Sequence, residues 1–255
     1  NPRDGISLGA LQFAIEHNPI KAVLTISNFN NPLGSCIPDE KKKDLVELLA
    51  RYDIPLIDND VYGEMYFTEK RPMVTKAFDK KGLVMLCSSF SKDISPSLRV
   101  GWTVVPARHR STIEWLKFTT SAATATLPQM AIAEFLESGG YDHHLRRMRR
   151  EYASNVALLS QAATHTFPPG TRVTRPSGGF VLWVQLPETV DSMELYSLAL
   201  QNNITITPGY LFSPTNQYSN FIRLNAAAWN LPIARALQRL GEMVIEMMAR
   251  GQAKK

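Results

Sequence analysis

Short apolar runs rich in β-branched residues alternate with amphipathic stretches over the first hundred residues, and this alternation constrains the fold most. The strand-like runs are residues 21–27, 54–57, 83–87 and 100–105. Residues 39–52, between the first two runs, have helical periodicity with Leu45, Leu48 and Leu49 on one face. Strands separated by helical crossovers predict an α/β domain with a mostly parallel sheet, covered on both faces.

The second half of the sequence has a different pattern. Helical periodicity dominates from residue 111 to about residue 164, and the longest predicted helix covers residues 141–164. The elements predicted after it are strands at 179–186 and 221–225 and helices at 192–202 and 232–249. We therefore predict a partial large domain over residues 1–140 and a smaller α+β domain over residues 141–255, which begins with the long helix.

Composition narrows the class of protein. Hydrophobic residues make up 44% of the chain, but its apolar runs are far shorter than the roughly 20 residues that cross a bilayer, so no membrane span is expected. Cys36 and Cys87 cannot form a disulfide framework, which favours a cytoplasmic protein. The sequence begins with Asn1 rather than Met, which indicates a piece of a longer protein.

The net charge of +5 raises the question of an anionic partner. The densest basic run is Arg146, Arg147, Arg149 and Arg150. This run lies in a helical pattern without accompanying aromatic residues, so a solvated helix face is favoured over a nucleic-acid stripe. His143 and His144 precede it but lack ligand partners at useful spacing, so no metal site is predicted.

The segment Ser-Ser-Phe-Ser-Lys at residues 88–92 combines groups that can do chemistry. Lys92 leaves an apolar strand beside Ser89 and lies seven residues before Arg99. This spacing puts an amine nucleophile near a hydroxyl and a guanidinium that suit a phosphate. Such a set suits pyridoxal phosphate, whose aldehyde reacts with a neutral amine, although an isolated loop lysine is far more often a solvated charge.

Ser-Phe-Ser-Lys, followed by Leu-Arg-Val-Gly-Trp, resembles the corresponding segments of fold-type I aminotransferases. More specifically, the chain resembles the aminotransferase-like domain of MocR-type regulators in the GntR family, over essentially its whole length. The resemblance implies that Lys92 bonds covalently to pyridoxal 5'-phosphate and that Ser89 and Arg99 bind the cofactor. It also implies a homodimer, because proteins of this fold type share their sites between two subunits.

Two further segments carry the family pattern in the expected order. Residues 30–34 (Asn-Asn-Pro-Leu-Gly) resemble the family's Asn-Pro-x-Gly turn, which implies that Asn31 contacts the cofactor's phenolic oxygen and the substrate. Residues 57–62 resemble the segment after the next strand, which implies that Tyr62 also hydrogen-bonds the phenolic oxygen. Without the resemblance, both segments read as ordinary turn and strand-end residues.

The chain departs from its family three positions before Tyr62. An acidic residue there pairs with the pyridine nitrogen in the family, whereas this sequence has Asn59. Asp58 and Asp60 flank it, but neighbours in an extended segment point to opposite faces, so neither replaces it without a bulge or a register shift. Which of the three residues meets the pyridine nitrogen stays open at this point.

Residues 221–225 (Phe-Ile-Arg-Leu-Asn) resemble the strand that binds the substrate carboxylate in this family. The resemblance implies that Arg223 binds the carboxylate of an amino acid, while the partner could also be an amine effector. A guanidinium can make two parallel charge-assisted hydrogen bonds to a carboxylate, and a lysine cannot. The alternative interpretation is a surface arginine on an edge strand.

The resemblance leaves two functions open. In one, the chain is the effector domain of a transcriptional regulator, and DNA is bound by a winged-helix domain upstream of Asn1. In the other, the chain belongs to a free-standing aminotransferase that moves an amino group between an amino acid and a 2-oxo acid. Asn59 favours the regulator, because sensing requires binding rather than turnover. In the family about a third of the domain precedes Asn1, so we expect uncovered sheet edges.

Overall fold

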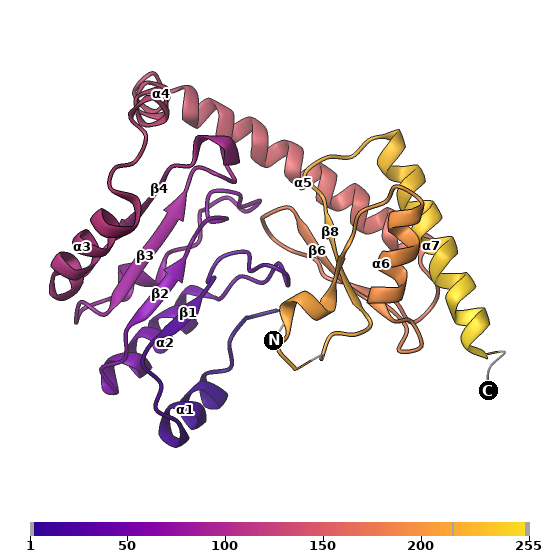
Figure 1. Cartoon of the computed structure of the whole chain (residues 1–255), viewed down its shortest axis with the longest axis horizontal. Coiled ribbons are helices and arrows are strands. Elements are labelled where there is room, and N and C mark those ends of the chain that lie inside the picture. The colour runs from indigo at the N-terminus through magenta and orange to yellow at the C-terminus, as the bar shows by residue number, and fades with distance from the viewer. Residues whose placement is uncertain (1–2, 216, 253–255) are drawn as a thin grey trace. The chain divides into compact units, whose positions relative to one another are not determined.

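The computed structural model describes residues 3–215 and 217–252, which form two compact units (Figure 1). Unit 1 runs up to Asn30 and from Ser35 to Arg149. Unit 2 comprises Asn31–Gly34 and the chain from Arg150 onward. The boundary between the two units falls within a long helix, between Arg149 and Arg150.

Unit 1 contains a four-stranded sheet in the order β1-β2-β3-β4 (Figure 1). The strands are β1 (Val23–Thr25), β2 (Leu56–Asn59), β3 (Val84–Ser89) and β4 (Gly101–Val104). The first three are parallel, and β4 runs antiparallel to β3 because the short connection between them leaves no room for a crossover helix. The mostly parallel sheet predicted from the sequence is thus confirmed.

One face of this sheet is covered by α2 (Asp39–Arg51), which begins directly after Pro38 with two acidic residues in its first turn. Leu45, Val46 and Leu49 of α2 pack with residues of β1, β2 and β3 in the core of unit 1, and side chains of α1 (Leu8–His17) pack against this cluster. The other face is less covered than predicted: Leu24 of β1 is 69% exposed, and every residue of β4 is exposed.

Three helices follow the sheet along the chain: α3 (Arg110–Ser121), α4 (Thr126–Glu137) and α5 (Gly140–Thr166). The α5 helix confirms the long helix predicted over residues 141–164. Large apolar side chains of β4, α3 and α4 remain exposed, among them Trp102, Trp115, Phe118, Leu127 and Met130. Of these five residues only Trp102 belongs to a strand, so most of this exposure is on helix surfaces and does not test the expectation of uncovered sheet edges.

Unit 2 contains an antiparallel sheet in the order β5-β6-β8-β7, together with helices α6 (Ser192–Gln201) and α7 (Leu231–Gln252). Its strands are β5 (Arg172–Val173), β6 (Val181–Gln185), β7 (Thr207–Pro208) and β8 (Phe221–Asn225). Short 3-10 helices elsewhere in the chain cover Thr75–Phe78, Pro96–Leu98, Ala107–His109 and Gly209–Phe212. Of the helices described, none has the length and apolar character needed to cross a membrane.

Candidate functional site

Lys92 lies in the connection between β3 and β4, and backbone hydrogen bonds close this loop. Ser89 pairs with Gly101, and the Phe90 amide donates to the Val100 carbonyl oxygen at 3.1 Å. The Phe90 carbonyl then accepts from the amides of Ile94 and Ser95, each at 3.0 Å. The Lys92 side chain is exposed on this turn, so its amine is open to a reagent from solvent.

The same loop holds the other two residues predicted to bind the cofactor. Ser89 is half-buried, and its Oγ accepts from the Ser91 amide at 3.4 Å. Arg99 has a left-handed backbone (φ 54°), an exposed side chain and one hydrogen bond from Nη1 to the Pro96 carbonyl oxygen at 3.2 Å. The structure thus brings a hydroxyl, an amine and a guanidinium together in one loop, a donor set that suits a phosphate.

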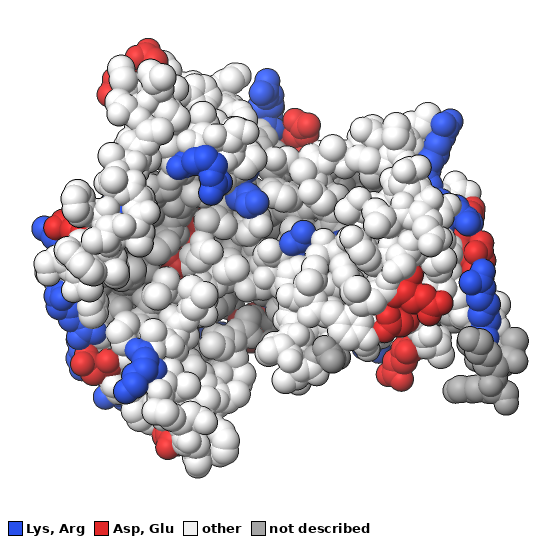
Figure 2. Space-filling view, in the orientation of Figure 1, with Lys and Arg blue, Asp and Glu red and all other residues white. Residues whose placement is uncertain are grey.

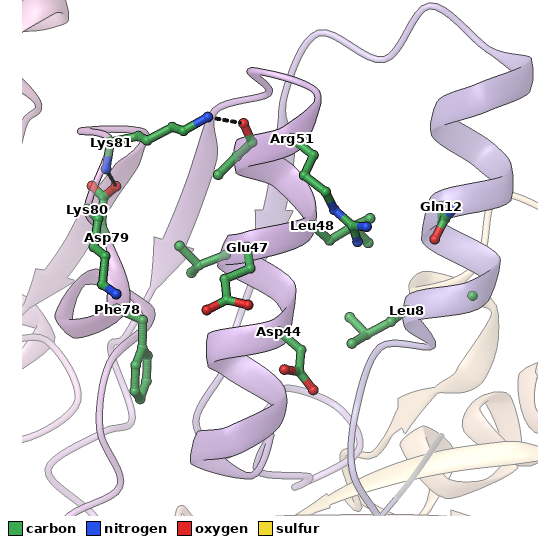
Figure 3. Close-up of a pocket in the computed structure, with 13 residues that line it drawn as sticks. Leu8, Gln12, Asp44, Glu47, Leu48, Arg51, Phe78, Asp79, Lys80 and Lys81 are labelled. Carbon is green, nitrogen blue, oxygen red and sulfur yellow. Dashed lines mark hydrogen bonds between the residues drawn. The ribbon is translucent and has the colours of Figure 1, made fainter.

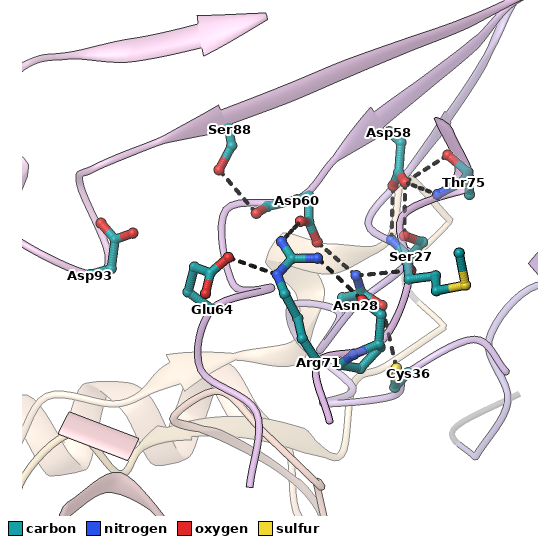
Figure 4. A network of polar contacts seen from close by, with 12 residues as sticks. Ser27, Asn28, Cys36, Asp58, Asp60, Glu64, Arg71, Thr75, Ser88 and Asp93 are labelled. Atoms are coloured by element: carbon teal, nitrogen blue, oxygen red, sulfur yellow. Dashed lines mark hydrogen bonds and ion pairs between the residues drawn. The ribbon is translucent and has the colours of Figure 1, made fainter. Parts of the chain in front are cut away.

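Asp58, one of the open candidates for the pyridine nitrogen, is fully buried and already saturated with donors (Figure 4). Ser27 donates to its carboxylate from the amide at 3.2 Å and from Oγ at 2.9 Å. Thr75 donates from its amide at 3.1 Å and from Oγ1 at 2.7 Å, and Thr25 Oγ1 lies at 3.4 Å. Asp58 therefore binds neighbouring segments of unit 1 together.

Asp60, the other flanking acid, is also engaged (Figure 4). Its carboxylate accepts from Asn28 Nδ2 at 2.8 Å and from the Arg71 guanidinium. Burial raises the pKa of Asp60, and the adjacent Arg71 opposes that shift. Asn59, the last residue of β2, is half-buried and alternates with buried Asp58 along the strand, as the two-residue period requires.

The ion-pair network extends from Asp60 around the loop that carries Tyr62, which is itself buried. Arg71 Nε donates to Glu64 Oε1 at 2.7 Å. Arg149 of α5 donates to the Glu64 carbonyl oxygen at 2.7 Å and to Glu64 Oε2 at 3.0 Å. The expectation that the basic run is only a solvated helix face is therefore wrong for Arg149, whose guanidinium is also 3.9 Å from the Tyr66 ring centroid. Arg146, Arg147 and Arg150 are exposed.

Lys42 is a buried cation that the sequence analysis did not single out. Its ammonium donates to Asn28 Oδ1 at 2.8 Å, to Asp39 Oδ1 at 3.0 Å and to the Met73 carbonyl oxygen at 2.6 Å. Lys42 stands three residues before Leu45, on the buried face of α2. This position on the apolar face of the helix could have indicated that Lys42 is buried. However, Lys42 lies in a run of three lysines, a pattern that is typical of a solvated surface.

Unit 2 brings together Asn31 and Arg223, which are far apart in the sequence. Arg223 Nη1 donates to Asn31 Oδ1 at 2.9 Å, and Nη2 donates to Thr207 Oγ1 of β7 at 3.1 Å. The guanidinium carbon lies 5.5 Å from the Phe212 ring centroid, and buried Nε has no hydrogen-bond partner among the described residues. All these partners are uncharged, which leaves Arg223 available to an anion.

Gly34 fixes the turn that carries Asn31. Its φ of +69° is a backbone conformation that residues with a side chain rarely adopt, and a Cβ at this position would lie 2.8 Å from Pro176 Cβ. The glycine thus allows the Asn-Pro-Leu-Gly turn to pack closely against the rest of unit 2.

A groove of about 620 Å³ lies between α1, α2 and residues 78–81 of unit 1 (Figure 3). Its labelled charged residues are of both signs: Asp44, Glu47, Arg51, Asp79, Lys80 and Lys81. Figure 2 likewise shows basic and acidic residues interspersed on the visible face. His143 and His144 are the two histidines for which no metal site was predicted. His143 is exposed, and His144 contacts the Asp93 carbonyl oxygen.

Comparison with known proteins identifies what this chain is similar to. The family model for aminotransferase class I and II matches residues 4–239. The chain is 40% identical to HTH-type transcriptional regulator YjiR and 37% identical to HTH-type transcriptional regulator YdcR, both uncharacterized proteins of Escherichia coli (strain K12). These alignments cover 97% and 96% of this chain but 53% of each relative, so the chain spans about half their length.

Among solved structures, the chain is similar to LysN, an alpha-aminoadipate aminotransferase from Thermus thermophilus complexed with N-(5'-phosphopyridoxyl)-L-leucine. The TM-score is 0.91 at 28% identity, and the match covers 97% of this chain and 64% of that protein. This similarity confirms the predicted fold class, a fold-type I large domain with a smaller α+β domain.

Proposed function

Because the chain belongs to the aminotransferase class I and II family, we propose that it binds pyridoxal phosphate through Lys92 and an amino compound through Arg223, as the effector domain of a transcriptional regulator. The observation that carries the proposal is the closed loop that holds Ser89, Lys92 and Arg99. The parent protein, in this proposal, is a homodimer in the cytoplasm and meets DNA only through a separate winged-helix domain.

The residues of unit 1 fit this cofactor in all but one respect. When bound, pyridoxal phosphate supplies an aldehyde that bonds to amines and a ring that withdraws electrons. Lys92 would hold the aldehyde through its amine, while Ser89 and Arg99 would donate to the phosphate. Tyr62 would donate to the phenolic oxygen. Asn59 is the exception, because it would offer the pyridine nitrogen an amide in place of a carboxylate.

The residues of unit 2 fit an amino-acid carboxylate. Arg223 is held by two neutral oxygens, those of Asn31 and Thr207, and retains a buried Nε without a partner among the described residues. A carboxylate arriving there gains charge-assisted hydrogen bonds without displacing an acidic residue. Asn31 accepts from Arg223 and so orients the guanidinium, while its Nδ2 can donate to the cofactor or to the amino compound.

The regulator is preferred to the enzyme on the chemistry around Asn59. A carboxylate keeps the pyridine nitrogen protonated, which promotes removal of the amino-acid α-proton, whereas an amide can only donate a hydrogen bond to the neutral nitrogen. The acids that could substitute, Asp58 and Asp60, are both occupied by other donors. The alternative is an aminotransferase such as LysN, to which the chain is also similar.

Borohydride reduction tests the cofactor proposal. The parent protein is incubated with pyridoxal phosphate and reduced, and the modified lysine is located by peptide mass mapping. We expect the pyridoxyl group on Lys92 at low cofactor concentration, since its loop supplies the phosphate donors. A label located instead on exposed Lys80 or Lys117 would contradict the proposal.

The substitution Asn59→Asp separates the regulator from the enzyme. We expect it to speed single-turnover conversion of the bound cofactor to its amine form at least about tenfold, because a carboxylate beside a pyridinium contributes a few kcal/mol in a shielded site. Stopped-flow absorbance with the twenty common amino acids measures the rate.

Asn230→Asp is the matched control, since that residue caps α7 and either side chain serves there. Rapid conversion by the wild type, unchanged by Asn59→Asp, would show instead that the chain is an efficient aminotransferase whose acid lies elsewhere.

A further inference from the structure

Asp93, the residue directly after Lys92, is buried and bonded to α5 at two points. Its carboxylate oxygen Oδ2 accepts from the Tyr141 hydroxyl at 2.6 Å, and its carbonyl oxygen is 2.6 Å from His144 Nε2. A carbonyl oxygen can only accept, so His144 must carry a proton on Nε2. Backbone and side chain of one residue are thus both held by the first turns of one helix.

The surroundings keep these bonds in place. The Tyr141 ring meets Phe90 edge-on at 6.2 Å and Phe135 at 6.3 Å between centroids, and His144 lies 6.1 Å from Phe135. Burial raises the pKa of Tyr141, and the hydrogen bond to Asp93 raises it further, so the hydroxyl stays a donor. Burial also raises the pKa of Asp93, and the Tyr141 bond opposes that shift.

These contacts matter because the exposed and flexible Lys92 side chain extends from this backbone, so the position of the backbone limits where the amine can reach. On the N-terminal side, the loop is fixed by the bond from the Phe90 amide to the Val100 carbonyl. On the C-terminal side, the contacts of Asp93 with α5 fix it. Arg149, two turns further along α5, anchors the Tyr62 loop through Glu64, so one helix holds both segments.

We propose that Asp93 is a positioning residue, which through Tyr141 and His144 sets Lys92 at the place where its amine can bond to the cofactor aldehyde. The inference rests on the proposed function and goes beyond it, because it assigns a role in cofactor attachment to three residues outside the family motifs. It ties the Lys92 loop to the unit 1 part of α5, which contains both Tyr141 and His144.

The test compares the affinities of the parent protein for two ligands. Pyridoxal phosphate bonds to Lys92, whereas pyridoxamine phosphate has the same ring and phosphate but no aldehyde. We expect Tyr141→Phe to weaken binding of pyridoxal phosphate about tenfold and binding of pyridoxamine phosphate less than about twofold, since only the first needs a well-placed amine. Absorbance titration measures both, and thermal unfolding of the cofactor-free protein reports stability.

Tyr210→Phe is the matched control, because the Tyr210 hydroxyl donates to Asp191 Oδ2 at the same distance of 2.6 Å in unit 2. It should cost similar stability and change neither affinity. Asp93→Asn gives a conservative check: its amide oxygen still accepts from Tyr141, so it should bind pyridoxal phosphate several times more tightly than Asp93→Ala.

Equal weakening of both ligands by Tyr141→Phe would overturn the inference, since it would mean that Tyr141 only supports the fold. Unchanged binding of both ligands would overturn it as well. If wild-type Lys92 takes no borohydride label, the proposed function fails first and the inference falls with it. Those outcomes are distinguishable, because the label is read in the wild type before any variant is compared.

Discussion

Arg223→Lys is expected to weaken binding of an amino acid to the cofactor-loaded parent protein about thirtyfold, while the affinity for pyridoxal phosphate itself changes little. The guanidinium already donates one hydrogen bond to Asn31 and another to Thr207. A lysine is a single-point donor that cannot satisfy both oxygens and grip a carboxylate with two parallel bonds. The expected loss of about 2 kcal/mol corresponds to that factor.

Absorbance titration of the cofactor-loaded protein with the twenty common amino acids measures this effect. Arg239→Lys on α7 is the control, because that exposed arginine pairs only with Glu242 and Glu246 and with the Asn202 side chain in the described structure. A loss of cofactor affinity as large as the loss of amino-acid affinity would show that Arg223 supports the fold of unit 2 rather than binding the ligand.

Asp58→Asn is expected to lower the free energy of unfolding of the cofactor-free full chain by about 3 kcal/mol. The substitution replaces one carboxylate oxygen with an NH2 group that faces donors from Ser27 or Thr75, so at least one buried amide or hydroxyl loses its acceptor. In a fully buried site, no solvent replaces that bond. Urea unfolding followed by circular dichroism measures the change.

The matched control for Asp58→Asn is Asp44→Asn, an exposed position on α2 where the unfolding free energy should change by less than about 0.5 kcal/mol. A stable Asp58→Asn protein whose bound cofactor shows altered absorbance would indicate that Asp58, rather than Asn59, meets the pyridine nitrogen. That result would also mean that β2 has a different register from the observed one.

The sequence predicts most of the fold because its signals are local. Apolar runs and helical periodicity locate β1 to β3, α2 and α5, and the two-residue strand period correctly separates Asn59 from Asp58. The antiparallel direction of β4 follows from the length of its connection, which the prediction of a mostly parallel sheet allowed without specifying. Ser89, Lys92 and Arg99 were found together because they belong to one short loop.

What the sequence could not predict depends on partners distant along the chain. Arg149 looks like its exposed neighbours, and only the fold brings it to Glu64, 85 residues away. Asp93 has no local signal either, because Tyr141 lies 48 residues further on. The prediction that both faces of the unit 1 sheet are covered was wrong for a related reason. The pattern of a strand indicates that its side chains can be buried, but it does not show whether residues 1–255 contain the helices that would bury them.

The three acceptors around Lys42 have a consequence for labelling chemistry. Pyridoxal phosphate is a general reagent for accessible amines, but all three protons of the Lys42 ammonium are engaged inside unit 1, so this nitrogen presents neither a lone pair nor a surface. Lys42 can react only when α2 and the Met73 segment separate. The yield of modified Lys42 against time therefore measures how often this part of the molecule opens, in the same experiment that reads the occupancy of Lys92.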